Sequence, residues 1–181
     1  MKAMRSPLVL ASTLVLAASA TAGAAPGPVP TRSCEERIEA GDAPLRFPAP
    51  KRGRIFAGPL ALSGHFPTTS AGLGPRHENG RFSTKVGALI RAGRPVVLSV
   101  PRHVRGTLFV HYARTRDGGP AVRFEPCAPS TAAFSYDGVV GRVTGFSGGF
   151  EVTRQGCYPL DVRVVGGRSY RVALPLGRPC R

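Results

Sequence analysis

The most regular pattern in this chain is an alternation of apolar and polar residues near its C-terminus. Every second residue from Tyr158 to Val165 is apolar, and Ser169 to Leu176 repeats the pattern after the turn signal Gly166-Gly167. A period of two is typical of a half-buried β-strand. The two segments therefore predict a hairpin that turns one face toward the core.

Shorter segments of the same kind precede this hairpin, and no helical stripe longer than two turns follows the N-terminal leader. Glycine and proline signals separate the segments. Seven or eight such strands predict an all-β fold, an antiparallel two-sheet sandwich that is immunoglobulin-like or a small barrel. The expected strands are Ile55–Leu62 (broken by Gly58-Pro59), Lys85–Ile90, Pro95–Val100, Thr107–Ala113, Ala121–Cys127, Val139–Thr144 and Gly149–Thr153.

The N-terminal part of the chain lacks the strand pattern of the predicted sandwich. Residues 1–24 have a short basic region, an apolar run and small residues that offer cleavage sites, as a secretory signal peptide does. The apolar run is too short for a membrane span. Residues 25–53 are rich in proline and predict an extended segment, with one short helical turn at the Ser33–Glu36 capping box. We expect the β domain to cover residues 54–181 and the protein to be secreted.

Four cysteines follow the leader, and an even number in a secreted chain predicts two disulfides. Folding residues 158–176 as a hairpin brings Cys157 and Cys180 to the same end. We therefore expect Cys157–Cys180, with Cys34–Cys127 joining the N-terminal segment to the domain. Cys127–Cys157 with Cys34–Cys180 is the alternative.

The chain is strongly basic, with 25 Lys+Arg against 10 Asp+Glu and a formal net charge of +15. Hydrophobic residues make up 42% of it, which argues against a disordered polyelectrolyte. We expect no nucleic-acid binding, because no stacking platform or groove-reading element accompanies the charge. An arginine-rich surface favours an anionic partner. A GC-rich genome that prefers arginine to lysine codons accounts for the same excess.

Several basic clusters fall in successive connections and strand ends. If these ends gather at one rim of the sandwich, they form a positive patch for an anionic cell-wall polymer or a protein. The alternative is a set of solvated charges without a ligand. The candidate anion-binding residues are Arg91, Arg94, Arg102, Arg105, Arg114 and Arg116.

The segment from Gly145 to Gly149 matches the G-x-S-x-G motif of serine hydrolases, with Ser147 in the place of the nucleophile. It also resembles the G-D-S-G-G loop of trypsin-like proteases, with Phe146 where that family has aspartate. The residues that follow alternate like a strand, so a glycine corner between two strands explains the motif. The chain has four histidines that could act as a base in the alternative, and they are His65, His77, His103 and His111.

Other catalytic and metal chemistry has little support in the sequence. The cysteines form no Cys-x-x-Cys, and His103 and His111 lack a third ligand, so we expect no metal and no cofactor. Cross-strand charge pairing explains the carboxylates better than a glycosidase pair does. These carboxylates are Glu125, Asp137, Glu151 and Asp161.

Over roughly residues 85–181 the chain resembles a group of secreted actinobacterial β-rich proteins. The matching stretches include Val122-Arg-Phe-Glu-Pro-Cys127, Phe146-Ser-Gly-Gly-Phe150 and Cys157-Tyr-Pro-Leu160. The resemblance implies an exported, disulfide-bonded domain and no particular activity. We therefore expect a non-enzymatic protein of the cell envelope or exterior. The alternatives are a small serine hydrolase using Ser147 and a protease inhibitor that presents residues 128–138.

Overall fold

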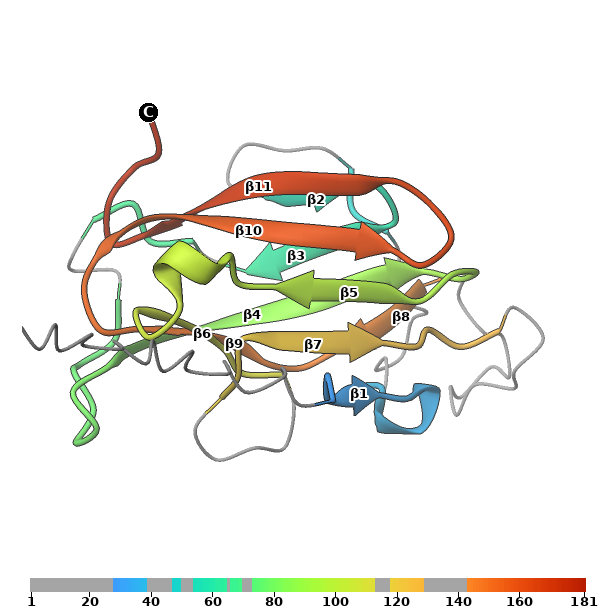
Figure 1. Cartoon of the computed structure of the whole chain (residues 1–181), viewed down its shortest axis with the longest axis horizontal. Coiled ribbons are helices and arrows are strands. Elements are labelled where there is room, and N and C mark those ends of the chain that lie inside the picture. The colour runs from blue at the N-terminus through green and yellow to red at the C-terminus, as the bar shows by residue number, and fades with distance from the viewer. Residues whose placement is uncertain are drawn as a thin grey trace, which may run out of the picture.

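The fold is a sandwich of two β-sheets, as the alternating pattern predicts. The computed structural model describes residues 28–38, 47–49, 54–64, 66–69, 73–112, 118–128 and 143–181. In Figure 1 the strands lie in two layers that run along the long axis of the molecule. The described residues form eleven strands, more than the seven or eight expected.

The first sheet has the order β1-β7-β5-β10-β11, and its long hairpin, β10 with β11, is the one that the alternation predicts. Its other neighbouring strands are antiparallel as well, except that β1 runs parallel to β7. The bounds of its strands are β1 Thr31–Arg32, β5 Val96–Ser99, β7 Ala121–Phe124, β10 Gly156–Val164 and β11 Ser169–Leu176.

The second sheet has the order β2-β3-β4-β9-β6, and β8 also pairs with β4. Its longest strand, β4, pairs with β8 at one end and with β9 at the other. The bounds of its strands are β2 Ile55–Ala57, β3 Leu60–Gly64, β4 Phe82–Arg91, β6 Leu108–Val110, β8 Val143–Phe146 and β9 Gly149–Val152.

Residues 55–62 form two strands instead of the single broken strand that we expected. Gly58 has a φ of 57°, which is the left-handed region that glycine adopts without cost, and it turns β2 back onto β3. Pro59 completes the turn. The interruption in the apolar pattern was thus a hairpin turn, and this is one reason why the strand number was underestimated.

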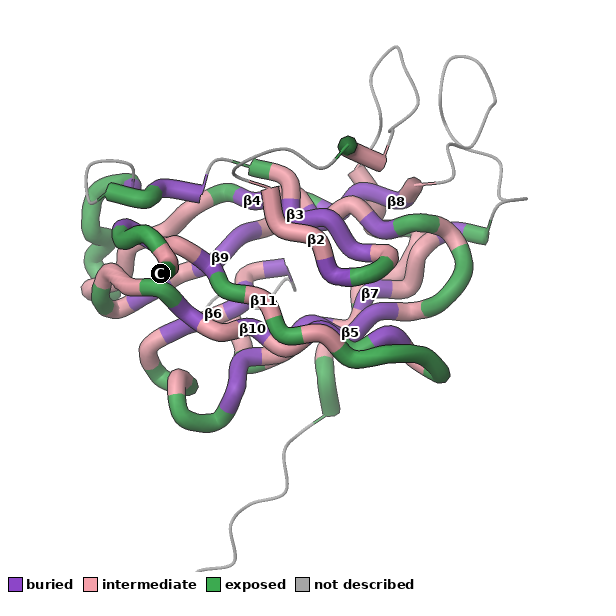
Figure 2. The backbone as a smooth tube through the Cα atoms, turned by 90° about the horizontal axis from the view of Figure 1, so that it is seen from above, coloured by how far each residue is buried: buried purple, intermediate pink, exposed green. Residues whose placement is uncertain are grey.

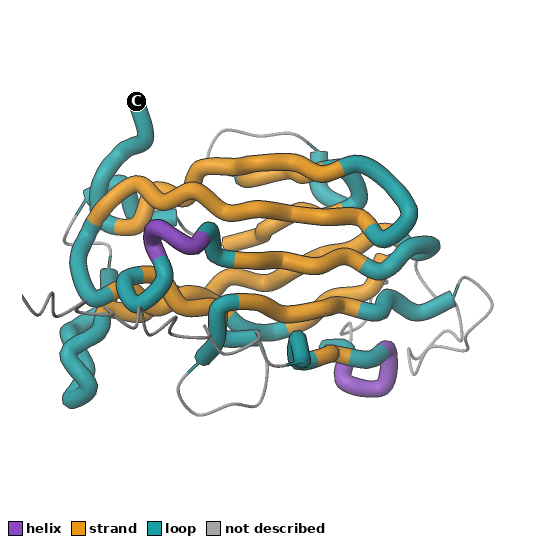
Figure 3. The backbone as a smooth tube through the Cα atoms, in the orientation of Figure 1, coloured by secondary structure: helices purple, strands orange, loops and turns teal. Residues whose placement is uncertain are grey.

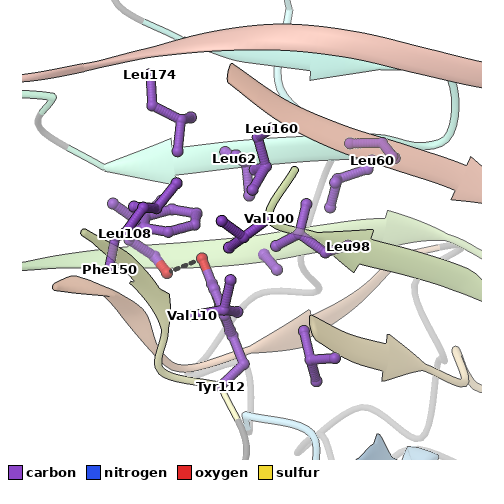
Figure 4. Packing of buried hydrophobic residues seen from close by; sticks show 14 of the residues in the cluster. Leu60, Leu62, Leu98, Val100, Leu108, Val110, Tyr112, Phe150, Leu160 and Leu174 are labelled. Atoms are coloured by element: carbon purple, nitrogen blue, oxygen red, sulfur yellow. Dashed lines mark hydrogen bonds between the residues drawn. The ribbon is translucent and has the colours of Figure 1, made fainter. Parts of the chain in front are cut away.

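The core lies between the two sheets and consists of the alternating residues of both. Figure 2 shows that buried residues are distributed along the strands of both layers. Figure 4 shows Leu98 and Leu160 of the first sheet close to Leu60 and Leu62 of the second. The side chains of all four are almost inaccessible to solvent. The alternation of apolar and polar residues therefore set the orientation of these strands correctly.

Aromatic rings fill the part of the core near β1 in the absence of tryptophan. The ring of Tyr112 stands nearly perpendicular to that of Phe124, with centroids 5.2 Å apart, and contacts Phe150 in the same way. Its buried hydroxyl donates a hydrogen bond of 2.6 Å to the carbonyl oxygen of Val86 in β4 (Figure 4). Burial raises the pKa of Tyr112 well above its ordinary value.

Two disulfides join the chain as the hairpin argument predicted, Cys34–Cys127 and Cys157–Cys180. All four cysteines of the chain are thereby paired. The first bridge holds a 3-10 turn, η1 (Cys34–Glu36), beside the end of β7 (Figure 3). This is the short helical turn expected at Ser33–Glu36, and the carboxylate of Glu36 accepts a hydrogen bond from the backbone N–H of Ser33.

Part of the N-terminal segment, which we expected to be extended and irregular, takes part in a sheet. β1 adds a strand to the edge of the first sheet. The guanidinium of Arg32 donates to the carbonyl oxygens of Tyr112 and Glu36, and the N–H of Ile38 donates to Gly145. The signal-peptide prediction for residues 1–24 lies outside the described residues. In the part of the chain that the structure describes, no helix has the length and apolar character to cross a membrane.

Candidate functional site

The G-x-S-x-G segment forms a tight corner between β8 and β9, and a strand follows the serine. In the described structure it lacks the helix that supports the nucleophile of α/β-hydrolases. The backbone of Gly149 comes so close to β4 that a Cβ atom built on it would lie 2.0 Å from the carbonyl oxygen of Thr84. Packing against β4 therefore requires a glycine at position 149.

Ser147 itself is exposed on this corner. His77 is held by a contact of 2.8 Å between its Nε2 and the Oγ of Ser83. His111 lies with its Nε2 3.0 Å from the carboxylate of Glu151, and His103 belongs to η3 (Arg102–Val104). None of these three described histidines has a hydrogen bond to Ser147; His65 lies outside the described residues.

The structure does not bring the predicted anion-binding arginines to one rim. Arg91 and Arg94 precede β5, whereas Arg102 and Arg105 follow it, so the two pairs lie at opposite ends of that strand. Connections before and after one strand necessarily lie at opposite ends of the sheet, because the strand runs between them. The remaining two candidates, Arg114 and Arg116, lie outside the described residues.

Three of these arginines have contacts within the protein. The guanidinium carbon of Arg91 lies 4.2 Å from the centroid of the Phe47 ring. Arg94 donates to the carbonyl oxygen of Gly166, and Arg105 donates to that of Val100. These contacts hold the three side chains against neighbouring groups of the protein.

A different group of arginines converges where four strands begin or end. Arg76 lies in the loop before β4, Arg154 lies between β9 and β10, and Arg178 follows β11. Together with Phe82, Thr153 and Gln155 they line a hollow of about 550 Å³, which we call the arginine pocket. It lies at the end of the sandwich that carries the C-terminus, on the left in Figure 1.

The pairing of the strands places these residues together. Phe82 at the start of β4 is opposite Val152 at the end of β9, and this pairing brings the loop of Arg76 to the β9–β10 connection. Gly156 at the start of β10 is opposite Leu176 at the end of β11, so Arg154 and Arg178 flank the open end of one hairpin. The Cys157–Cys180 bridge closes the same end.

The lining of the arginine pocket is electrostatically one-sided. It contains no carboxylate among the described residues, and no ion pair joins Arg76, Arg154 or Arg178 to an acidic residue there. All three arginines are exposed. The Nε of Arg76 donates to the carbonyl oxygen of Gly80 at 2.7 Å, which orients one guanidinium and leaves its other donors available.

The positive charges of this pocket affect the pKa of the neighbouring Tyr158. Burial raises the pKa of its hydroxyl, while a hydrogen bond with the Arg154 side chain and the charges of Arg154 and Arg178 lower it in part. The same hydroxyl donates to the carbonyl oxygen of Arg154 and fixes the connection that carries this residue. Two of the three guanidiniums therefore act on one buried polar group.

A second, smaller hollow of about 190 Å³ lies over β4 and β9. Here Glu151 is the acceptor of a compact network. Its carboxylate is 3.3 Å from a nitrogen of Arg81 and 3.0 Å from the Nε2 of His111. Arg81 also stacks on Phe109, with its guanidinium carbon 3.6 Å from the ring centroid. This hollow therefore contains a carboxylate, Glu151, whereas the described lining of the arginine pocket has none.

Two more of the carboxylates that the sequence singled out, Asp161 and Glu125, lie in the described residues, and both pair with arginines, the first of them across strands. Asp161 is opposite Arg171 and accepts a hydrogen bond of 2.7 Å from it. Glu125, which directly follows β7, pairs with Arg123 in that strand. Asp137, and residues 129–138 of the loop considered for an inhibitor, lie outside the described residues.

Comparison with known proteins gives no indication of the function. No protein-family model and no curated protein matches this chain. Within the described residues, no group of three or more histidine, cysteine, aspartate or glutamate side chains is arranged to hold a metal ion.

Proposed function

We propose that this chain is a secreted, non-enzymatic β-sandwich protein that binds an anionic ligand through its arginine pocket. The observation that carries the proposal is the convergence of Arg76, Arg154 and Arg178 on one hollow whose described lining has no carboxylate. A charge that is paired within the protein can stabilise the fold. Three exposed charges of the same sign around a hollow instead repel one another. Their approach is favourable when an anion lies between them.

The size and framework of the site support a binding role. Its volume of about 550 Å³ falls in the range of small-molecule pockets, about 300–1,000 Å³. Two disulfides are compatible with an oxidising, extracellular environment. Because the arginines are exposed, each contact is screened by solvent, and we expect an affinity that depends strongly on ionic strength.

Retention on an immobilised anionic polymer, such as polyphosphate, tests the proposal. A protein with a net charge of +15 will bind any polyanion to some extent, so a matched control is needed. We compare Arg154→Gln/Arg178→Gln with Arg163→Gln/Arg168→Gln. Both variants remove two exposed charges. The control pair lies at the other end of the same hairpin, roughly 23 Å along β10 at 3.3 Å per residue.

We expect the pocket variant to elute at clearly lower salt than the control variant and the wild type. The control should differ from the wild type only by the general loss of charge. Elution of both variants at the same salt concentration would show that net charge alone retains the protein, and the proposed pocket would then have to be abandoned.

A further inference from the structure

The arginine pocket has more positive charge and more donors than a single carboxylate needs. We infer that its ligand is a phosphate monoester of a polyhydroxyl compound, such as a sugar phosphate, free or at the end of a polymer; this inference rests on the proposed function. Each guanidinium carries five N–H donors. The Nε of Arg76 donates to Gly80, and the Arg154 side chain forms a hydrogen bond with Tyr158, so these contacts use only a few of the donors. A carboxylate offers two oxygens and one negative charge.

A phosphate monoester matches this site better than a carboxylate does, both in charge and in the number of acceptor oxygens. It carries a charge of about −1.5 to −2 at pH 7 and three terminal oxygens. The three guanidiniums come from three separate connections of the fold, before β4, before β10 and after β11. Groups that approach from different sides suit three tetrahedrally arranged oxygens, whereas a planar carboxylate is satisfied by one arginine in bidentate geometry.

The remaining lining indicates what the phosphate is attached to. The hollow is too large for a phosphate alone, and its other lining residues are Thr153, Gln155 and Phe82. A hydroxyl and an amide can exchange hydrogen bonds with ligand hydroxyl groups. The Phe82 ring, packed against the core at the base of β4, offers an apolar surface to the C–H face of a sugar or polyol.

Three ligands with one sugar ring separate this inference from the proposed function. Isothermal calorimetry at low ionic strength would measure the binding of glucose 6-phosphate, glucuronate and glucose to the wild-type protein. We expect glucose 6-phosphate to bind at least about tenfold more tightly than glucuronate, the equivalent of one additional charge-assisted hydrogen bond. Glucose should show no measurable binding.

The pH dependence provides a second readout that needs no variant. The second pKa of a phosphate ester is about 6, so its affinity should fall severalfold between pH 7.5 and 5 as the dianion takes up a proton. Glucose 6-sulfate, which stays a monoanion, is the control. The groups that face the site are the three arginines and the hydroxyl of the neighbouring Tyr158. Arginine and tyrosine side chains, as classes, titrate well above this pH range. His77 lies next to Arg76 in the chain, but it contacts Ser83 and is not among the described lining residues.

The outcomes are distinct. Equal binding of glucuronate and glucose 6-phosphate, with both lost in Arg154→Gln/Arg178→Gln, would overturn the phosphate inference and leave the anion site standing. Binding of none of the anions, free or polymeric, would overturn both. Binding of glucose 6-phosphate that the pocket variant and the control variant Arg163→Gln/Arg168→Gln retain equally would place the phosphate elsewhere and also overturn the inference.

Discussion

Alanine at position 149 should destabilise the sandwich strongly, whereas alanine at position 147 should leave it almost unchanged. A Cβ atom on Gly149 would lie 2.0 Å from the carbonyl oxygen of Thr84 and 3.2 Å from the Cα of Lys85. Both contacts are backbone atoms of β4, and Lys85 is the register partner of Gly149. The clash therefore cannot be relieved by rotating a side chain, and β9 would have to move away from β4.

The expected size follows from the cost of overpacking, which is typically 1–3 kcal/mol. Because backbone atoms of a paired strand are involved here, we expect the upper end, about 3 kcal/mol. That corresponds to a fall in Tm of about 6–12 °C for a chain of this size. Ser147 is exposed, and its replacement by alanine should change stability by less than about 0.5 kcal/mol.

Urea unfolding followed by far-ultraviolet circular dichroism measures both changes, and the sheets supply the signal in a protein without tryptophan. A free energy of unfolding within 1 kcal/mol of wild type for Gly149→Ala would refute the close approach of β9 to β4. The interpretation of the motif as a corner would be refuted separately if a serine-directed covalent probe labelled the wild type but not Ser147→Ala.

Three further predictions concern the framework of the sandwich. Burial raises the pKa of Tyr112, so the folded state holds this proton more tightly than the unfolded chain, in which the pKa is about 10. The contribution of Tyr112 to stability should therefore be constant below pH 10 and be lost above it. Above pH 10 the unfolding free energy should fall less for Tyr112→Phe than for the wild type, and an equal fall would contradict the assignment. Replacing both Cys34 and Cys127 by alanine should lower the free energy of unfolding by about 4.6 kcal/mol, according to the loop-entropy relation for a separation of 93 residues. A loss of less than half of this in thermal unfolding would mean that the unfolded chain gains little freedom when the bridge is removed. Gly58→Ala should cost about 1–2 kcal/mol for the left-handed conformation alone, and more because the added Cβ would contact the Tyr170 ring. If the loss of unfolding free energy in the double variant with Tyr170→Ala, measured in urea, equals the sum of the two single losses, that contact would be ruled out.

The part of the fold that the sequence predicted best is the local pairing near the C-terminus. The period of two in residues 169–176 predicts β11 at its observed bounds, and the hairpin it forms also led to the correct pairing of Cys157 with Cys180. The strand β1 has no comparable signal. It consists of two residues whose partners, Arg123 and Phe124, lie about ninety positions further along the chain, and no short pattern records such a pairing.

The same distinction applies to the arginine pocket. Arg154 and Arg178 could have been placed together, because they lie three residues before and two residues before the two cysteines of the predicted bridge. Arg76 could not, since its position depends on the pairing of β4 with β9 across a long stretch of sequence. The basic clusters that we expected to form one patch, such as Arg91 with Arg94, are close in sequence. In the fold, β5 separates this cluster from the next one, Arg102 with Arg105.

The order of the two disulfides along the chain has a consequence for biogenesis. Each bridge joins neighbouring cysteines, the first with the second and the third with the fourth. If the chain is oxidised from its N-terminus as it emerges into an oxidising compartment, Cys34 meets its native partner before any other thiol arrives. Sequential oxidation thus produces the native pairs directly, and maturation does not require an isomerase to rearrange bridges.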